Sequence, residues 1–155
     1  MSGCPFHRML RHLKVFAGLP VPDAVKWIDG RPDFRQIDEE KLMKAVRYKL
    51  CAVCGKRLKF YAFWIGGERT RQFHYFTDAP MHRECAEESA RLCPFLNGTR
   101  LHYRGELPSH ELHDNSGRPA RMYIMQGVTD AFEVRMLGNA PALYAGDTLN
   151  AIREF

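Results

Sequence analysis

Four residues of the kinds that bind metal ions occur as two pairs with the same spacing. Cys51 and Cys54 form a Cys-x-x-Cys pair in "CAVCG", and His82 and Cys85 form a His-x-x-Cys pair in "HREC". Zinc takes thiolate sulfur and imidazole nitrogen as ligands in a tetrahedral array, at about 2.0–2.3 Å. Gly55 permits the tight backbone turn that brings two neighbouring sulfurs onto one ion. The spacing therefore predicts one zinc ion, held by three cysteines and one histidine.

Two other roles for these cysteines remain open. In redox proteins a Cys-x-x-Cys pair lies at the end of a strand and the start of a helix. Here the pair follows a predicted helix and precedes a predicted strand. Free cysteines are also among the most buried residues and could fill a core. We favour the metal site because two pairs with ligand spacing occur together.

Three further groups of cysteine and histidine residues are weaker candidates. Cys4 and His7 have ligand spacing, but no second pair lies near them in the sequence. His110 and His113 lie in the polar stretch "SHELHD", where we expect solvent-exposed side chains. Cys93 follows the last predicted ligand by eight residues of helix, or about 12 Å of rise, so one zinc ion cannot bind both. We expect Cys93 to pack in the core.

The elements that would position the four ligands can be predicted from sequence patterns. Residues 37–50 form a predicted helix that Asp38 caps, with Leu42, Val46 and Leu50 on its buried side. The aromatic runs 58–65 and 72–76 read as two strands of a hairpin with Gly66 and Gly67 at its turn. A helix over 80–96 would then carry the last two ligands. This order of Cys-x-x-Cys turn, hairpin and helix is the treble-clef arrangement.

The rest of the chain has less regular patterns. Residues 1–37 are rich in proline and are predicted to be irregular, and residues 97–119 read as a turn-rich connection. Two strands are expected in "RMYIMQG" and "AFEVRML", followed by a possible strand and a short terminal helix capped by Asp147. The predicted fold class is α+β: a treble-clef-like, zinc-stabilised hairpin and helix with an additional C-terminal β-hairpin. We assign 1–37 to an N-terminal segment, 38–96 to the zinc-centred core and 97–155 to a β-rich extension, in one compact domain.

Charge is distributed unevenly along the chain. Residues 1–60 hold 13 Lys and Arg against 6 Asp and Glu, a net charge of +7, whereas residues 61–155 hold 10 against 12, a net charge of −2. A basic half favours an anionic partner such as nucleic acid, although an ordinary solvated surface is an open alternative. Aromatic residues Tyr61, Phe63 and Tyr75 could stack on bases if exposed, but a buried hairpin face is the favoured interpretation. The predicted nucleic-acid-binding residues are Lys41, Lys44, Arg47, Lys56, Arg57, Lys59, Arg69 and Arg71.

Two enzyme classes are alternatives to a binding module. His82 and Glu84 match the His-x-Glu of zinc deaminases, but there the Cys-x-x-Cys follows a proline and comes second, and here Cys85 would compete for the open position on the metal. A nuclease on a related scaffold needs a histidine base, for which His74 is a candidate, and a second ligand cluster, which 78–96 does not supply. A zinc ion with four protein ligands is structural. We therefore expect a protein that is not an enzyme.

The stretches "CAVCGKRL", "DAPMHRECAEESARLCPFL" and "AFEVRMLGNAPALYAG" resemble a family of small bacteriophage and prophage proteins to which no activity is assigned. Its members carry Cys-x-x-Cys-Gly, then Pro-x-His-x-x-Cys-Ala, then Cys-Pro-Phe-Leu. The resemblance extends from about residue 18 onward. It implies the treble-clef zinc centre, a viral or mobile-element origin, and ligand roles for Cys51, Cys54, His82 and Cys85.

The phage resemblance also suggests a second functional hypothesis: an effector that binds and inhibits a host protein of replication, transcription or defence. No apolar run approaches the roughly 20 residues that cross a bilayer. We therefore expect no membrane partner and a cytoplasmic location, which the resemblance places in a bacterial host cell.

Overall fold

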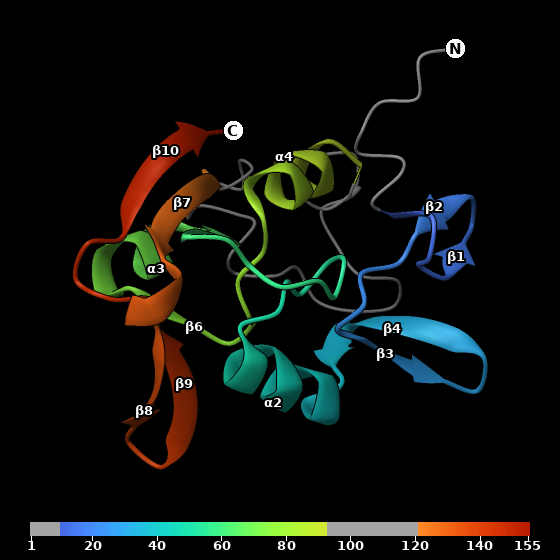
Figure 1. Ribbon diagram of the computed structural model, residues 1–155, viewed down its shortest axis with the longest axis horizontal. Helices are drawn as coiled ribbons and strands as arrows, with labels where there is room; N and C mark the ends of the chain where they lie inside the picture. Colours follow the sequence, from blue (N-terminus) through green and yellow to red (C-terminus); the bar gives the residue numbers. More distant parts are fainter. Residues whose placement is uncertain (1–9, 93–120) are drawn as a thin grey trace, which may run out of the picture.

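The structure, a computed structural model, describes residues 10–92 and 121–155 (Figure 1). The first strands are β1 Val15–Phe16, β2 Leu19–Pro20, β3 Val25–Ile28 and β4 Arg31–Ile37. The helices are α2 Glu39–Tyr48, α3 Glu68–Phe73 and α4 Arg83–Leu92, and a 3-10 turn, η1, spans Thr129–Ala131. The later strands are β5 Tyr61–Gly66, β6 Tyr75–Phe76, β7 Tyr123–Val128, β8 Glu133–Leu137, β9 Ala140–Tyr144 and β10 Asn150–Glu154.

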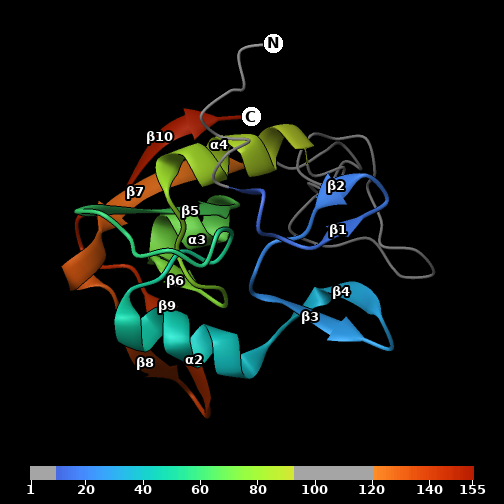
Figure 2. The ribbon, with the colours of Figure 1, turned by 45° about the vertical axis from the view of Figure 1, so that its right-hand side comes forward.

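The strands form several small antiparallel sheets. In the order β10-β7-β5, strand β7 is central and pairs with β5 from Tyr61 opposite Val128 to Gly66 opposite Tyr123. A second three-stranded sheet has the order β6-β9-β8, and β1-β2 and β3-β4 are separate two-stranded hairpins. Both views show the β3–β4 and β8–β9 hairpins extending outward from the body of the protein (Figure 2). The fold is therefore α+β, as predicted.

The core joins segments that are far apart in the sequence. Trp64 of β5 is fully buried, stacks on Phe76 with ring centroids 5.2 Å apart, and meets the edge of Phe132 at 5.6 Å. Gly127 of β7 provides the room for this indole, because a Cβ there would lie 3.1 Å from the Trp64 ring. The same buried cluster includes Leu10 and the thiols of the predicted metal site.

The two longer predicted helices are present. Asp38 caps α2 as expected, since its Oδ1 accepts a hydrogen bond from the backbone N–H of Lys41 at 3.1 Å. Ala45 is the fully buried residue of α2, and Leu42 and Val46 are partly buried against the core. Helix α4 lies within the predicted span 80–96.

The predicted hairpin between 58–65 and 72–76 is wrong. Its supposed turn continues into helix α3, which Gly67 precedes and in which the Thr70 hydroxyl donates to the Gly67 carbonyl at 2.7 Å. Strand β5 pairs with β7 instead, and β6 pairs with β9. The physical reason is strand length: β7 pairs with all six residues of β5, whereas only Tyr75 and Phe76 of the predicted second strand are extended.

The prediction of an irregular N-terminal segment is also wrong for the described part of 1–37. Ala17–Gly18 and Asp29–Gly30 form two-residue turns in which every residue has a positive φ, between 50° and 79°. Such turns match the twist of antiparallel strands and favour hairpins. The proline-based argument overlooked the Asp-Gly signal, and Pro32 fits because it pairs within a two-stranded ribbon.

The predicted terminal helix is a strand. β10 pairs antiparallel with the free edge of β7, with Ala151 opposite Met125. The Asp147 side chain accepts a hydrogen bond from the Tyr144 hydroxyl and does not cap a helix. The predicted strands around "VTD" are present as β7 and β8, but β8 forms the C-terminal hairpin with β9 and not with β7.

Several predictions lie outside the described residues. They concern Cys4 and His7, Cys93, the 97–119 connection, and the pair His110 and His113. Within residues 10–92 and 121–155, no helix has the length and apolar character needed to cross a membrane.

Replacing Asp38 with alanine is expected to destabilise the protein by about 1 kcal/mol, because the Lys41 N–H loses its capping acceptor. Asp38→Asn keeps an acceptor oxygen, so its effect on the free energy of unfolding should be only a few tenths of the effect of the alanine variant. Urea unfolding followed by the fluorescence of buried Trp64 measures both variants. Equal stability of wild type and the alanine variant would contradict the capping role.

Candidate metal centre

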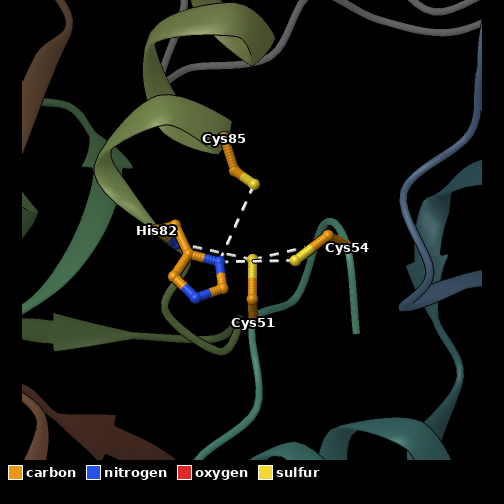
Figure 3. A group of neighbouring side chains, drawn as sticks. All are labelled: Cys51, Cys54, His82 and Cys85. Atoms are coloured by element: carbon orange, nitrogen blue, oxygen red, sulfur yellow. Dashed lines mark hydrogen bonds between the residues drawn. The ribbon is translucent and has the colours of Figure 1, made fainter. Parts of the chain in front are cut away.

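The structure brings together the four predicted ligands. The ligand atoms of Cys51, Cys54, His82 and Cys85 all lie within 4.8 Å of one another, and all four residues are buried. Figure 3 shows the side chains converging from two directions, with two from the turn before β5 and two from the start of α4. The His82 Nδ1 atom lies 3.3 Å from the sulfur of Cys54 and 3.9 Å from that of Cys85.

The first pair sits in a tight turn of the zinc-knuckle type, here defined as residues 50–58. The Cys51 N–H donates to the Lys56 carbonyl at 2.7 Å, and the Gly55 N–H donates to the Cys51 carbonyl at 2.9 Å. Gly55 has φ of +74°, a conformation that suits glycine. The backbone N–H groups of Val53 and Cys54 point at the Cys51 sulfur at 3.4 and 3.5 Å. The turn thus holds this sulfur in a position that favours the thiolate.

The second pair is placed by one β-bridge and a helix. Phe63 and Met81 exchange two backbone hydrogen bonds of 2.9 and 2.8 Å, which fixes the chain just before α4 against β5. His82 and Cys85 then lie on the same side of the helix start, three residues apart. The long predicted hairpin is therefore replaced by this single bridge, and the treble-clef order of turn, strand and helix is retained.

The imidazole of His82 is oriented by a second contact. Its Nε2 lies 2.8 Å from the Arg57 carbonyl oxygen and donates to it, which leaves the lone pair of Nδ1 directed at the sulfurs. Histidines that bind metals usually donate their other ring nitrogen to a carbonyl or carboxylate in this way. The donor set fits a cation, because a buried nitrogen and three buried sulfurs share one centre.

The protonation of the cluster is strongly coupled. Burial raises the pKa of the Cys51 thiol, but hydrogen bonds from the side chains of Cys54 and Cys85 and from backbone N–H groups outweigh burial and lower it to about 3. Hydrogen bonds to Cys51 and Cys54 raise the pKa of the Cys85 thiol. A hydrogen bond with Cys54 also raises the pKa of His82, and its bond to the Arg57 carbonyl acts in the same direction. A bound cation would displace these protons, so its affinity falls as the pH falls.

The geometry of the cluster and the position of His74 are relevant to the two enzyme classes considered from the sequence, a zinc deaminase and a nuclease. Cys85 lies in the cluster, where a deaminase would keep an open position, and Glu84 is exposed on α4. His74 ends α3 in the left-handed conformation, and its Nδ1 lies 2.8 Å from the Gly146 carbonyl. It is outside the Cys and His cluster that the structure forms.

The predicted basic residues lie on three elements: helix α2, the zinc-knuckle turn with the residue after it, and helix α3. Lys41 contacts Asp23, donating to its carbonyl at 2.8 Å, and Lys44 pairs with Glu40 at 3.0 Å. The predicted cations of α3, Arg69 and Arg71, follow strand β5 in the chain. This strand spans about 17 Å from Tyr61 to Gly66 at the usual rise per residue. On α3 the charge of Arg71 is balanced by Glu68, with which it pairs at 2.5 Å.

Three predicted basic residues remain exposed and close to the metal cluster. Among the residues that the structure describes, no carboxylate pairs with Lys56, Arg57 or Lys59. Directly after them the side chains of Phe60 and Tyr61 are 65% and 46% exposed. Sequence reasoning missed Phe60, whose position within "KRLKFYAF" among three cations was the available signal.

The predicted aromatic residues divide between surface and interior. Phe63 is buried, Tyr75 is half-buried and Tyr61 is exposed. The sequence-based preference for a buried aromatic face is therefore wrong for Tyr61. Its partner strand β7 turns away at η1, which leaves the start of β5 open to solvent.

Gly55 adopts a left-handed conformation and also leaves room for the Asp23 carboxylate. Two glycine variants separate these two roles. Gly55→Ala is expected to cost more than the ~1–2 kcal/mol of a left-handed alanine, because the new Cβ would lie 3.0 Å from the Asp23 carboxylate. Gly30→Ala, at a similar φ of +76° with no atom within 4 Å, should show only the conformational cost. Chemical denaturation of the metal-loaded proteins compares them. Equal losses would show that the Asp23 contact is unimportant.

Comparison with known proteins found no match among family models, curated proteins or solved structures. The resemblance to small phage and prophage proteins stays a prediction from the quoted motifs. The arrangement of the four ligands, with exposed cations beside them, is therefore the basis for a functional proposal.

Proposed function

We propose that this protein binds nucleic acid through a surface that a structural zinc ion organises. Zinc is the metal of choice for this centre because three thiolates and one imidazole suit a tetrahedral site with borderline-soft ligands. The four ligands, Cys51, Cys54, His82 and Cys85, would complete the coordination sphere without a place for water or substrate. The role of the ion is then to stabilise the fold.

The observation that carries the nucleic-acid proposal is a cationic segment, residues 56–59, at the end of the zinc-knuckle turn and directly after it. Lys56, Arg57 and Lys59 are exposed within four residues of chain, next to the metal cluster, and have no carboxylate partner among the described residues. The Arg57 carbonyl also receives the His82 hydrogen bond, so this backbone is fixed by the metal site. Fixed, unpaired cations attract phosphates and release counterions from nucleic acid.

One small cavity lies next to the zinc-knuckle turn. A cavity of about 60 Å³ lies between α2 and the zinc-knuckle turn, lined in part by Asp23, Lys41 and Gly55. Pockets for small-molecule substrates commonly measure about 300–1,000 Å³. This cavity is too small for such a substrate, so the proposed binding surface is the exterior of the turn.

A protein partner is the second candidate function, and strand β8 favours it. Val134, Met136 and Leu137 are 54%, 61% and 47% exposed on a hairpin that projects from the body (Figure 1). β8 is also the last strand of its sheet, with β9 as its neighbour on one side only. An exposed strand edge can pair with a strand of another chain. If the chain has the phage origin that its motifs suggest, a host protein is a candidate partner.

Elemental analysis should find about one zinc per chain in the purified protein. Cys85→Ser is expected to lose the metal and the cooperative unfolding transition, because structural zinc commonly contributes on the order of 10 kcal/mol to folding. Cys93→Ser, which removes a cysteine outside the described residues, should keep one zinc. Folded wild-type protein without metal that tolerates a strong chelator would refute the zinc centre.

Replacing Lys56, Arg57 and Lys59 together with glutamine should weaken binding to a labelled oligonucleotide and reduce the slope of log Kd against log salt by about 2 to 3. Arg69→Gln is the matched control, since it removes a cation from α3 and should leave the slope nearly unchanged. Fluorescence anisotropy over a salt series measures both.

A nuclease-treated pull-down from bacterial lysate separates the two candidate functions. Nucleic acid in the untreated sample that nuclease removes supports the first candidate. One protein recovered in stoichiometric amount after nuclease treatment, together with no anisotropy change in the oligonucleotide titration, would replace it with the second.

A further inference from the structure

We infer that the nucleic acid bound here is single-stranded, with unpaired bases stacking on Phe60 and Tyr61 while Lys56, Arg57 and Lys59 contact the phosphates. This inference rests on the proposed function and specifies its ligand. The five residues, named here the knuckle platform, occupy one run of six residues that begins two residues after Cys54. Only Leu58 in this run is buried.

The two aromatic rings are placed outside the core. Phe60 and Tyr61 are 65% and 46% exposed, and their ring centroids lie 4.8 Å apart in an edge-to-face arrangement with planes at 87°. Each ring of such a pair keeps part of a π-face accessible to a base. Base–aromatic stacking contributes about 1–3 kcal/mol per base and tolerates any sequence. Large exposed aromatic rings have a solvation cost that such a ligand would remove.

The backbone beneath the rings is held from both sides. Thr129 donates its hydroxyl to the Lys59 carbonyl, and its backbone N–H donates to the Phe60 carbonyl at 2.9 Å. Tyr61 begins β5 and pairs with Val128. On the other side the Leu58 N–H donates to the Lys49 carbonyl at 2.8 Å. The platform is therefore fixed before a ligand binds, which lowers the entropy lost on binding.

The C-terminal end of α2 adds a further exposed aromatic ring and a further cation beside the platform. The hydrogen bond from Leu58 to Lys49 places the last turn of α2 beside the platform. There Tyr48 is 55% exposed, and the Arg47 guanidinium lies 5.4 Å from its ring centroid. A strand leaving Phe60 could continue toward a further aromatic ring and a further cation.

A single strand fits this platform better than a duplex. In a duplex the faces of the bases are covered by their neighbours, so rings on a protein surface cannot reach them without unstacking the helix. Cations followed directly by exposed rings along one short run can contact the phosphates and the neighbouring unpaired bases of one strand. A surface for duplex DNA would instead need an element that enters a groove.

The test compares a labelled single strand of about 12 nucleotides with the duplex it forms with its complement, by fluorescence anisotropy at fixed salt. We expect the single strand to bind at least about tenfold more tightly. Phe60→Ala and Tyr61→Ala should each weaken single-strand binding about 5- to 150-fold and change duplex binding less than about twofold. Phe60→Trp and Tyr61→Phe should retain the wild-type affinity for the single strand, because stacking is kept.

The controls distinguish failure of this inference from failure of the proposed function. Phe73→Ala removes a ring that is 60% exposed on α3, away from the platform, and should have no effect. Zinc content and thermal midpoint verify that each variant is folded. If duplex binds as well as single strand, or if the alanine variants bind normally while the glutamine variants of the cations do not, base stacking is wrong and nucleic-acid binding stands. Absence of binding to either oligonucleotide overturns both.

Discussion

Three sulfur atoms and one imidazole nitrogen converge in a buried site, and the rest of the structure depends on what holds them there. Their ligand atoms lie within 4.8 Å of one another. Several thiolates cannot share a site of low dielectric without a cation between them, because like charges repel strongly where water does not screen them. The turn at Cys51 and the start of α4 at His82 are far apart in the sequence and meet at this site. Backbone hydrogen bonds from Ala52 to the Pro80 carbonyl and between Phe63 and Met81 hold the chain before α4, and a metal ion bound by the four ligands would add a further link between the helix and the turn.

The same short segment serves the interior and the exterior of the protein. From Cys51 to Tyr61, the sulfurs and Leu58 point inward, whereas the cations and the aromatic rings point outward. The Arg57 residue illustrates the coupling, since its carbonyl accepts the His82 hydrogen bond while its side chain is exposed. If the site holds a metal ion, its loss is expected to disorder the proposed binding surface along with the site. Fold stability and the proposed nucleic-acid affinity should then respond together to changes in the ligands.

Packing away from the metal explains why the platform is rigid. Strand β7 pairs with β5 along its whole length, and its Gly127 makes room for Trp64. Where β7 ends, η1 supplies Thr129, whose two hydrogen bonds hold residues 59 and 60. The position of the exposed rings is set by a segment that lies nearly seventy residues later in the chain.

The sequence by itself determined the features that depend on residues close together in the chain. Ligand spacing identified Cys51, Cys54, His82 and Cys85, and the Asp38 cap identified the start of α2. The irregular order of predicted helices and strands identified an α+β protein. The pairing of strands was decided only by tertiary structure, because register and partner depend on which apolar faces meet across long stretches of chain. For this reason the expected hairpin after the zinc-knuckle turn is replaced by β5–β7 pairing, and residues 150–154 form a strand on β7 instead of a helix. Exposure was likewise decided by tertiary contacts: Phe63 and Tyr61 are similar residues in one strand, and only their neighbours determine that one is buried and the other can meet a ligand.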